Sequence, residues 1–512
     1  MTVLLRPGLG AQTLRLALLV IGLVMLSTAS SAHGQAQAAE EFVGPFPSWR
    51  QVQCSGGDDT ALLQNELNTL GRSGSPVLYI KAGVCRITAT LRLGQGVGAT
   101  GGVKNVSLLG HDPSDTTILW GGPAGGKMFE VDGVAYSRFG RLTWDGGGLA
   151  DIAYLDQTHA GENYFPTAVR HEDEVFRNIS GVALYLGGGT AGTSEWEYMR
   201  MQFLGPMQAG LYLANANTLD HWVWDSLFQN IAWGATNFVP ERGLNGSGGD
   251  FAINRSNFLN GGSDVAFGNV QPFGSSRWNY SKGSQHHLNG VGVGKVNASW
   301  TSLGETIIDP TSDSMAGVAD NGPIAFLGDT FRGGKPTGML GVHEAYCATS
   351  CLGDLWALGN TFSNAEPEQY AIPYPECCGR IHAGVDDKNG QVIVDPGPIA
   401  LPSTPPTSTL PVIEVQNGDI AAALAEADRQ AVIVHVPYGR WDVPATLEVG
   451  PNVTLTGDGF GATQLAAGPN VSPILHLAGP SHAVVRDLTL RGWTQNGRVT
   501  AGLLIDNADQ PG

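Results

Sequence analysis

The chain contains the same passage twice. Residues 77–93 read VLYIKAGVCRITATLRL, and residues 432–449 end in the related phrase VHVPYGRWDVPATLEV. Further along, NVSLLG at 105–110 matches NVTLTG at 452–457. Matching phrases in the same order, separated by loops of different length, indicate two copies of one architecture. We therefore expect the fold to start near residue 55 and to start again near residue 412.

Each copy is predicted to open with a short helix and to continue in short strands. Residues 58–60 (DDT) offer side-chain oxygens to the free amides of a helix N-terminus. Leu63, Leu67 and Leu70 then form one apolar stripe of a helix. A β-branched and aromatic run follows at 77–80. A short helix before many glycine-broken strands is typical of a solenoid with a capped end.

The middle of the chain repeats one strand-like phrase. Phe203, Phe228 and Phe258 recur at intervals close to one solenoid coil, and Phe331 and Phe362 follow the same pattern. Hairpin signals at regular two-residue spacing are missing, which argues against an up-and-down barrel. The pattern predicts an all-β fold, a right-handed parallel β-helix over residues 75–365. We expect the rings of Phe203, Phe228 and Phe258 inside it.

The opening of each copy resembles the N-terminal module of the pectate-lyase-like superfamily of right-handed β-helix proteins. The residues that carry the resemblance are Asp58, Asp59, Thr60, Gln64, Tyr79 and Gly83 in the first copy, with Pro437, Gly439 and Trp441 in the second. Lys81 and Cys85 depart from the family pattern. The resemblance implies the fold and says little about chemistry, because these positions build the cap and the first coils.

The N-terminus is predicted to be a signal peptide. Arg6 and Arg15 precede an apolar stretch, 16–26, that is too short to span a bilayer. Ala36-Gln37-Ala38 is a suitable cleavage site, with 30–32 as the alternative. We expect residues 1–38 to be removed and the mature protein to be secreted or periplasmic, without a membrane anchor.

The six cysteines favour disulfides in an exported chain. Cys54 and Cys85 bracket the predicted cap helix, and we expect them to pair. The other four are Cys347, Cys351, Cys377 and Cys378. Their spacing is poor for a zinc site, so a second set of disulfides of unknown pairing is expected and no metal is assigned.

The charge balance excludes one class of partner. The formal net charge is −18, and phosphate binding needs clustered Lys and Arg, so nucleic acid is not expected as a partner. A polyuronate would be repelled as well unless Arg side chains cluster or Ca²⁺ bridges the carboxylates. No cofactor is expected otherwise.

A connector rich in Pro, Ser and Thr occupies residues 396–411. We interpret residues 39–395 as the first β-helix domain and 412–512 as the start of a second. The second copy holds few coils. Either the chain is a fragment of a longer protein, which we favour, or the second copy packs against the first for cover.

The motifs in the sequence do not identify a reaction. The catalytic sets of polygalacturonases and the Arg-rich element of pectate lyases are missing from the sequence. Residues 171–174 (HEDE) lack the second histidine of a zinc-protease motif, and we interpret them as a charged loop.

The densest acidic region is 195–290, where equivalent positions of successive coils should stack. We name Asp225 and Asp250 as the main candidate catalytic or calcium-binding acids, with Asp220 and Glu197 as further candidates. Acids at β-helix turns also cap backbone amides, so a structural role stays open.

The same region holds candidate substrate-binding residues. Trp222 and Trp224 share one face of their strand, and exposed indoles stack on sugars whereas buried ones fill the coil. We name Arg255 and His221 as further substrate-binding residues, which would form hydrogen bonds with the sugar. We expect a secreted protein that cleaves a polysaccharide as a hydrolase or a lyase. The alternative is a non-catalytic, glycan-binding surface or matrix protein.

Overall fold

The computed structural model describes residues 40–507 except for short stretches. Those stretches are 73, 95–102, 158–165, 188–191, 216–217, 240–241, 243–248, 269–272, 292–298, 313–315, 318–323, 334–339, 342–354, 364–369, 372–380, 384–387, 389, 428–429, 495–496 and 499–500. The chain divides into a small unit, residues 1–44 with 405–409, and a large compact unit, residues 45–404 with 410–512. The large unit contains the whole β-helix.

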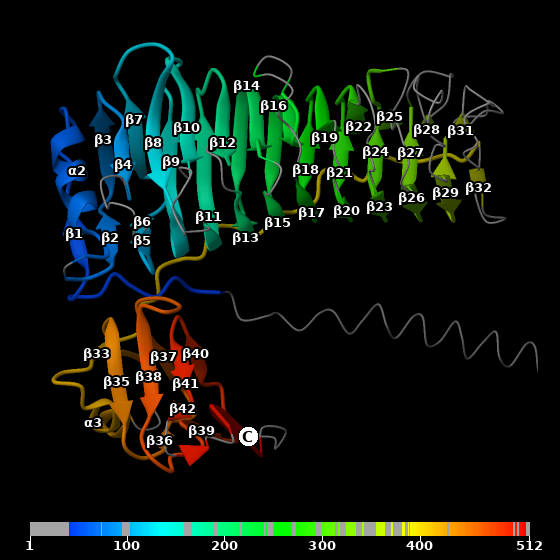
Figure 1. The fold of residues 1–512 in the computed structure, drawn as a ribbon. Helices are drawn as coiled ribbons and strands as arrows, with labels where there is room; N and C mark the ends of the chain where they lie inside the picture. Colours follow the sequence, from blue (N-terminus) through cyan, green and yellow to red (C-terminus); the bar gives the residue numbers. More distant parts are fainter. Residues whose placement is uncertain are drawn as a thin grey trace, which may run out of the picture. The chain divides into compact units, whose positions relative to one another are not determined.

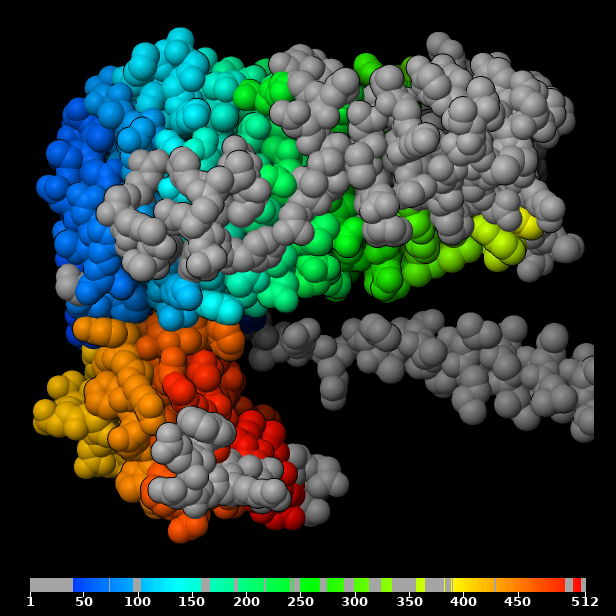
Figure 2. Space-filling model, in the orientation of Figure 1, coloured from blue at the N-terminus to red at the C-terminus, as the bar shows by residue number. Residues whose placement is uncertain are grey.

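Residues 50–383 form a parallel β-helix, which confirms the predicted fold (Figure 1). Each coil contributes one strand to each of three faces, which we call A, B and C. In Figure 1 the strands stack in chain order from blue at β1 to yellow-green at β32, and Figure 2 shows the same order along the surface. Every pairing between the described strands of this β-helix is parallel.

Face A contains β1 (Arg50–Val52), β2 (Val77–Ile80), β5 (Val103–Lys104), β6 (Ser107–Gly110), the first parts of β9 (Val134–Asp145) and β11 (Thr167–Arg177), β13 (Ser194–Met199), β15 (Leu219–Trp224), β17 (Asp250–Asn254), β20 (Phe273–Arg277), β23 (Ser299–Leu303), β26 (Ile324–Leu327), β29 (Leu355–Leu358) and β32 (Ile381–Ala383). Face B contains β3 (Gly83–Ile87), β7 (Thr116–Trp120), the ends of β9 and β11, the first parts of β14 (Gln202–Leu213) and β16 (Leu227–Thr236), β18 (Asn257–Leu259), β21 (Tyr280–Lys282), β24 (Thr306–Ile308), β27 (Thr330–Arg332) and β30 (Thr361–Phe362). Face C contains β4 (Leu91–Leu93), β8 (Gly126–Asp132), β10 (Ala150–Gln157), β12 (Val182–Leu186), the ends of β14 and β16, β19 (Ser263–Gly268), β22 (His286–Val291), β25 (Ala316–Gly317), β28 (Leu340–Gly341) and β31 (Tyr370–Ala371).

The phenylalanines stack inside the coils as expected. Phe203, Phe228 and Phe258 are at most 2% exposed. Their ring centroids follow one another at 4.6 and 4.8 Å, with the planes nearly parallel. Phe331 and Phe362 stack in the same way at 5.1 Å. Aromatic rings at one position of successive coils therefore form a ladder that fixes the register of the coils.

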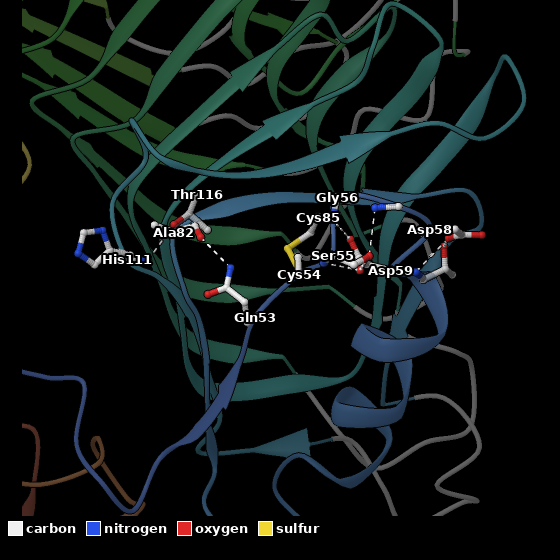
Figure 3. Close-up of a disulfide and its surroundings, with 12 residues drawn as sticks. Gln53, Cys54, Ser55, Gly56, Asp58, Asp59, Ala82, Cys85, His111 and Thr116 are labelled. Atoms are coloured by element: carbon white, nitrogen blue, oxygen red, sulfur yellow. Dashed lines mark hydrogen bonds between the residues drawn. A yellow bond between two sulfur atoms is a disulfide. The ribbon is translucent and has the colours of Figure 1, made fainter.

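The first coil is capped by α2 (Thr60–Thr69), as predicted. Cys54 and Cys85 form a disulfide with their Cα atoms 5.1 Å apart (Figure 3), which confirms that pairing. The expected capping differs in detail. Asp58, rather than Asp59, accepts a hydrogen bond from the backbone amide of Thr60. The Asp59 carboxylate turns back to Ser55 instead.

Residues 395–399, at the start of the predicted connector, form a strap on face B. The Asp395 carboxylate accepts hydrogen bonds from the Tyr280 hydroxyl at 2.8 Å and from the Lys282 ammonium at 2.7 Å. The Asn257 amide bonds both the backbone N–H and the carbonyl of Ile399. The prolines between and after these anchors explain why the strap does not join the sheet, because a proline has no backbone N–H to donate.

Residues 412–506, here called the C-terminal strand group, form further small sheets around their own apolar core. The group contains β33 (Val412–Glu414), α3 (Ile420–Glu426), β34 (Val432–His435), β35 (Gly439–Val443), β36 (Leu447–Glu448), β37 (Val453–Thr456), β38 (Thr463–Ala467), β39 (Leu475–Ala478), β40 (Val484–Arg486), β41 (Thr489–Arg491), β42 (Trp493–Thr494), β43 (Gly497–Arg498) and β44 (Leu503–Asp506). All its pairings are parallel except β42 with β43.

Candidate functional site

Face A carries a row of outward side chains on successive coils. Arg138, Arg170, Glu197 and Trp222 occupy equivalent positions of β9, β11, β13 and β15. Their neighbours in each strand, such as Phe139, His171 and Val223, are buried in the coil interior. The alternation of a β-strand therefore turns the row toward the outer face. Face B, by contrast, carries the strap over β18 and β21.

Ion pairs link the charged members of this row. Arg170 binds Glu197 at 2.7 Å, and Arg138 binds Glu172, the buried carboxylate one coil along. Burial by itself would raise the pKa of Glu172, but the charges of Arg138 and Arg170 outweigh it and lower that pKa. Glu172 therefore stays ionised. The carboxylates and guanidinium groups together present fixed hydrogen-bond donors and acceptors along the face.

The two predicted tryptophans point outward and are half-buried. Trp222 and Trp224 alternate with the buried His221 and Val223 along β15. The Arg255 guanidinium lies 5.5 Å from the centre of the Trp224 ring, a cation–π arrangement. Trp224 is therefore partly covered by this side chain, while Trp222 stands in the row beside Glu197.

His221 does not lie on the outer face, so its predicted substrate-binding role is wrong. Its ring is fully buried in the coil, where it bonds the Tyr198 hydroxyl at 2.9 Å and the Thr193 hydroxyl at 3.2 Å. Burial lowers the pKa of His221 to about 3, so the imidazole is neutral. Successive side chains of a strand point to opposite faces, so the sequence already indicated that the neighbours His221 and Trp222 do not both lie on the outer face.

Asp225 and Asp250 are not brought together, contrary to the expectation from their spacing. Trp224 is in register with Asn254, which sets Asp225 beside Arg255. Asp250 begins β17 and is in register with Phe273. About 13 Å of extended strand separates the two ends of β17. Coils of unequal length explain the error, because the coil from Asp225 to Arg255 takes 30 residues.

Asp225 belongs to a row of charged residues at the corner between faces A and B. This corner row consists of Arg141, Asp173, Arg200, Asp225 and Arg255, all with a left-handed backbone. Arg200 binds Asp173 with hydrogen bonds of 2.7 and 2.8 Å, and Arg255 binds Asp225 with bonds of 2.9 and 2.6 Å. The contacts of Asp225 and Arg255 are those of a turn-stabilising pair.

A second left-handed row lies at the start of face A. Tyr136, Ala168, Glu195 and Asp220 are the residues that the strand register skips on four successive coils. Their φ angles are 53°, 52°, 60° and 59°. Each of these strands therefore has one left-handed residue at the same point, and the exposed side chains of Glu195 and Asp220 lie on neighbouring coils. Strained non-glycine residues are frequent beside active sites.

Tyr136, at one end of this row, borders a cleft. Its ring centroid lies 5.7 Å from that of Phe460, and the two rings are 40% and 61% exposed. Lys104, Gln464 and Arg491 also line the cleft. Exposed aromatic rings beside hydrogen-bonding groups are a composition suited to binding sugars.

Sequence reasoning named Asp220, Glu197 and Trp222 correctly as residues of the outer face but did not select Tyr136, Arg138 or Arg170. The sequence held no comparable signal for Arg138, and acids closely follow only Arg170. The coil register that sets Arg138 and Glu197 beside Arg170 is not visible in the sequence. Cys347, Cys351, Cys377 and Cys378 lie outside the described residues.

The described residues contain no group of three or more His, Cys, Asp or Glu side chains arranged to hold a metal ion. They also contain no helix with the length and apolar character needed to cross a membrane.

Comparisons with known proteins found similar chains among solved structures. No family model and no curated protein matches the chain. Among solved structures, the catalytic domain of Agl-KA is 11% identical, with a TM-score of 0.39, and the match covers 69% of this chain and 70% of that one. The catalytic unit of a GH87 α-1,3-glucanase from Streptomyces thermodiastaticus strain HF3-3 is 10% identical, with a TM-score of 0.36 over 68% and 70%. The A-module of the mannuronan C-5 epimerase AlgE4 from Azotobacter vinelandii is 12% identical, with a TM-score of 0.32 over 87% and 96%.

Proposed function

We propose that the protein is a secreted, carbohydrate-active β-helix protein that binds a polysaccharide along the outer side of face A. The observation that carries this proposal is the outward row of Arg170, Glu197 and Trp222, together with the exposed left-handed residues Glu195 and Asp220 in the same strands as Glu197 and Trp222. An indole offers a flat apolar surface to a sugar ring, and the ion-paired groups offer hydrogen bonds to hydroxyls.

The same row supports a cleavage reaction. Glu195 and Asp220 sit on neighbouring coils, whose strands are about 4.8 Å apart. Carboxyl groups about 5–5.5 Å apart are typical of retaining glycosidases, and separations of about 6.5–9.5 Å are typical of inverting ones. We propose this pair as the acid and the nucleophile or base of a glycoside hydrolase, in place of Asp225 and Asp250. A lyase that uses Ca²⁺ for charge neutralisation is the second form of the proposal.

A non-catalytic glycan binder is the alternative function. It is favoured by the number of acids near face A that already hold an arginine, namely Glu172, Asp173, Glu197 and Asp225. A carboxylate held by a guanidinium is a poor proton donor, whereas it still accepts hydrogen bonds from a sugar.

We further propose that residues 412–512 begin a second copy of the pectate-lyase-like architecture. The order β33, α3, β34, β35, β36 repeats the order β1, α2, β2, β3, β4. Residues 1–38 are proposed to direct export, and no nucleic acid or membrane partner is proposed.

A panel of polysaccharides tests the function. Release of reducing ends would identify a hydrolase, and absorbance of unsaturated uronates would identify a lyase. Glu195→Gln and Asp220→Asn are each expected to lower cleavage at least a hundredfold while leaving binding intact. Asp309→Asn is the matched control, because Asp309 is also an exposed, left-handed acid but pairs with Arg332 on face B. Binding without any cleavage would select the alternative, and neither binding nor cleavage would reject both.

A further inference from the structure

Residues 45–49, here called the wedge, are buried although they precede the first strand of the β-helix. Phe46 is fully buried and Trp49 is 7% exposed. A backbone hydrogen bond from Trp49 to Phe46 closes the wedge into a turn, and the Gln51 amide also donates to the Phe46 carbonyl. The wedge thus holds two aromatic side chains in one compact apolar turn. The groups that bury these side chains indicate what the wedge does.

One side of the wedge packs on the β-helix. Tyr79 alternates in β2 with the core residues Leu78 and Ile80, so its ring lies on the outer side of face A. The Trp49 ring centroid lies 6.2 Å from that of Tyr79, and Tyr79 is nearly completely buried.

The other side packs on the C-terminal strand group. The Trp49 indole N–H donates to the Asp458 carboxylate at 2.5 Å. The same carboxylate accepts from the backbone N–H of Tyr438 at 2.7 Å, and it contacts the His435 ring nitrogen at 2.8 Å. Asp458 is almost fully buried, so each of these donors compensates for the cost of removing a carboxylate from water.

His435 explains why the wedge fits there. His435 and Ile433 alternate in β34 with the core residues Val432 and Val434, so they point out of the strand group, yet both are buried. Phe46 stacks on the His435 ring at 3.6 Å, with the planes 9° apart. The outer side of β34 is therefore a receptor surface, and the wedge is what covers it.

We propose that the wedge is a docking segment that joins the C-terminal strand group to the β-helix without a covalent link. Trp49 contributes to both contacts, through its ring to Tyr79 and through its N–H to Asp458. The two parts then form one body that persists after the connecting chain is cut. The partner that fits the His435 and Asp458 surface is this aromatic turn of the same chain.

The test is a cut in the full-length chain. A protease site is inserted between Thr409 and Leu410, so that the strap and residues 405–409 stay with the β-helix fragment. The cut wild-type protein is expected to elute as one species in size-exclusion chromatography at micromolar concentration. The cut Trp49→Ala protein is expected to separate, with association weakened at least tenfold. Trp278→Ala, which removes an exposed tryptophan elsewhere, should leave the fragments together.

Two results would overturn the proposal. One is separation of the cut wild-type protein at micromolar concentration, and the other is co-elution of the cut Trp49→Ala protein with undiminished affinity. If Trp49→Ala does not fold, Trp49→Phe decides the question. That variant keeps an aromatic ring but removes the indole N–H and part of the ring surface, so it should weaken association less than Ala would and more than Trp278→Ala does.

Discussion

Arg255 donates two hydrogen bonds, of 2.9 and 2.6 Å, to the Asp225 carboxylate. Both residues have a left-handed backbone, which residues other than glycine rarely adopt. The ion pair stabilises the two strained turns. A bidentate contact fixes both side chains in one geometry, which helps to retain a conformation that each residue would avoid alone. Asp225 therefore has a structural role that is visible without any ligand.

Replacing Asp225 should reduce stability and leave carbohydrate cleavage intact. Asp225→Ala removes the ion pair and places a less suitable residue in a left-handed turn, so the free energy of unfolding should fall by about 1–2 kcal/mol. Denaturant unfolding measures this change. Asp225→Asn should cost less, since asparagine tolerates the turn. Loss of cleavage with unchanged stability in both variants would restore Asp225 as a catalytic candidate.

Replacing Trp222 should weaken glycan binding. Trp222→Ala removes the outward indole from the row that contains Glu197, and we expect the dissociation constant of a bound oligosaccharide to rise about tenfold, in line with about 1.4 kcal/mol for an aromatic contact. Isothermal titration calorimetry measures it. Trp278→Ala, at the corner between faces A and B, is the control. Equal losses in both variants would remove face A as the binding surface.

Reduction should loosen the capped end of the β-helix. The Cys54–Cys85 disulfide closes a loop over a sequence separation of 31 residues. Replacing both residues with serine should lower the free energy of unfolding by about 2–4 kcal/mol. Thermal melting with and without reductant tests this, because reductant should destabilise the wild-type protein more than the double variant. The response that remains in the Cys54→Ser, Cys85→Ser protein measures the effect of reductant on the other cysteines.

Asp156 should make the fold less stable as the pH rises. Burial inside the coil, with a smaller contribution from Asp132, raises the pKa of Asp156 to about 8. Between an unfolded-state pKa of about 4 and this value, the folded protein holds a proton that the unfolded chain has lost. Stability from this group is therefore complete below about pH 4 and is lost as the pH rises to 8. Asp156→Asn should flatten this slope and raise the melting temperature at pH 8 by several degrees.

The melting temperature is measured at intervals from pH 4 to 9. Asp309→Asn, at an exposed position, should keep the wild-type slope. An unchanged slope in Asp156→Asn would contradict the prediction and would show that another group causes the loss of stability with rising pH.

Much of the fold could be predicted because it repeats. Phe203, Phe228 and Phe258 recur at the spacing of a coil, and a residue inside one coil has its equivalent inside the next. The Cys54–Cys85 pair was accessible for a similar reason, since both residues flank the one helix that caps the first coil. Local order and repetition are properties that a sequence displays directly.

The candidate site was harder to predict because it depends on register. The loops between strands differ in length, so residue spacing does not tell which acids meet, and Asp225 lies beside Arg255 rather than near Asp250. The left-handed residues Glu195 and Asp220 lie at the same point of neighbouring strands, and neither their backbone conformation nor their register can be read from residue spacing.

The corner row of alternating Arg and Asp residues has a consequence for how such a β-helix can change its length. Each ion pair, such as Asp173 with Arg200, joins two neighbouring coils. Insertion or deletion of a single coil between the partners would break a pair and bring like charges into adjacent positions. A gain or loss of two coils at once would preserve the alternation. In this part of the molecule a change of length by pairs of coils is therefore the change that keeps the ion pairs.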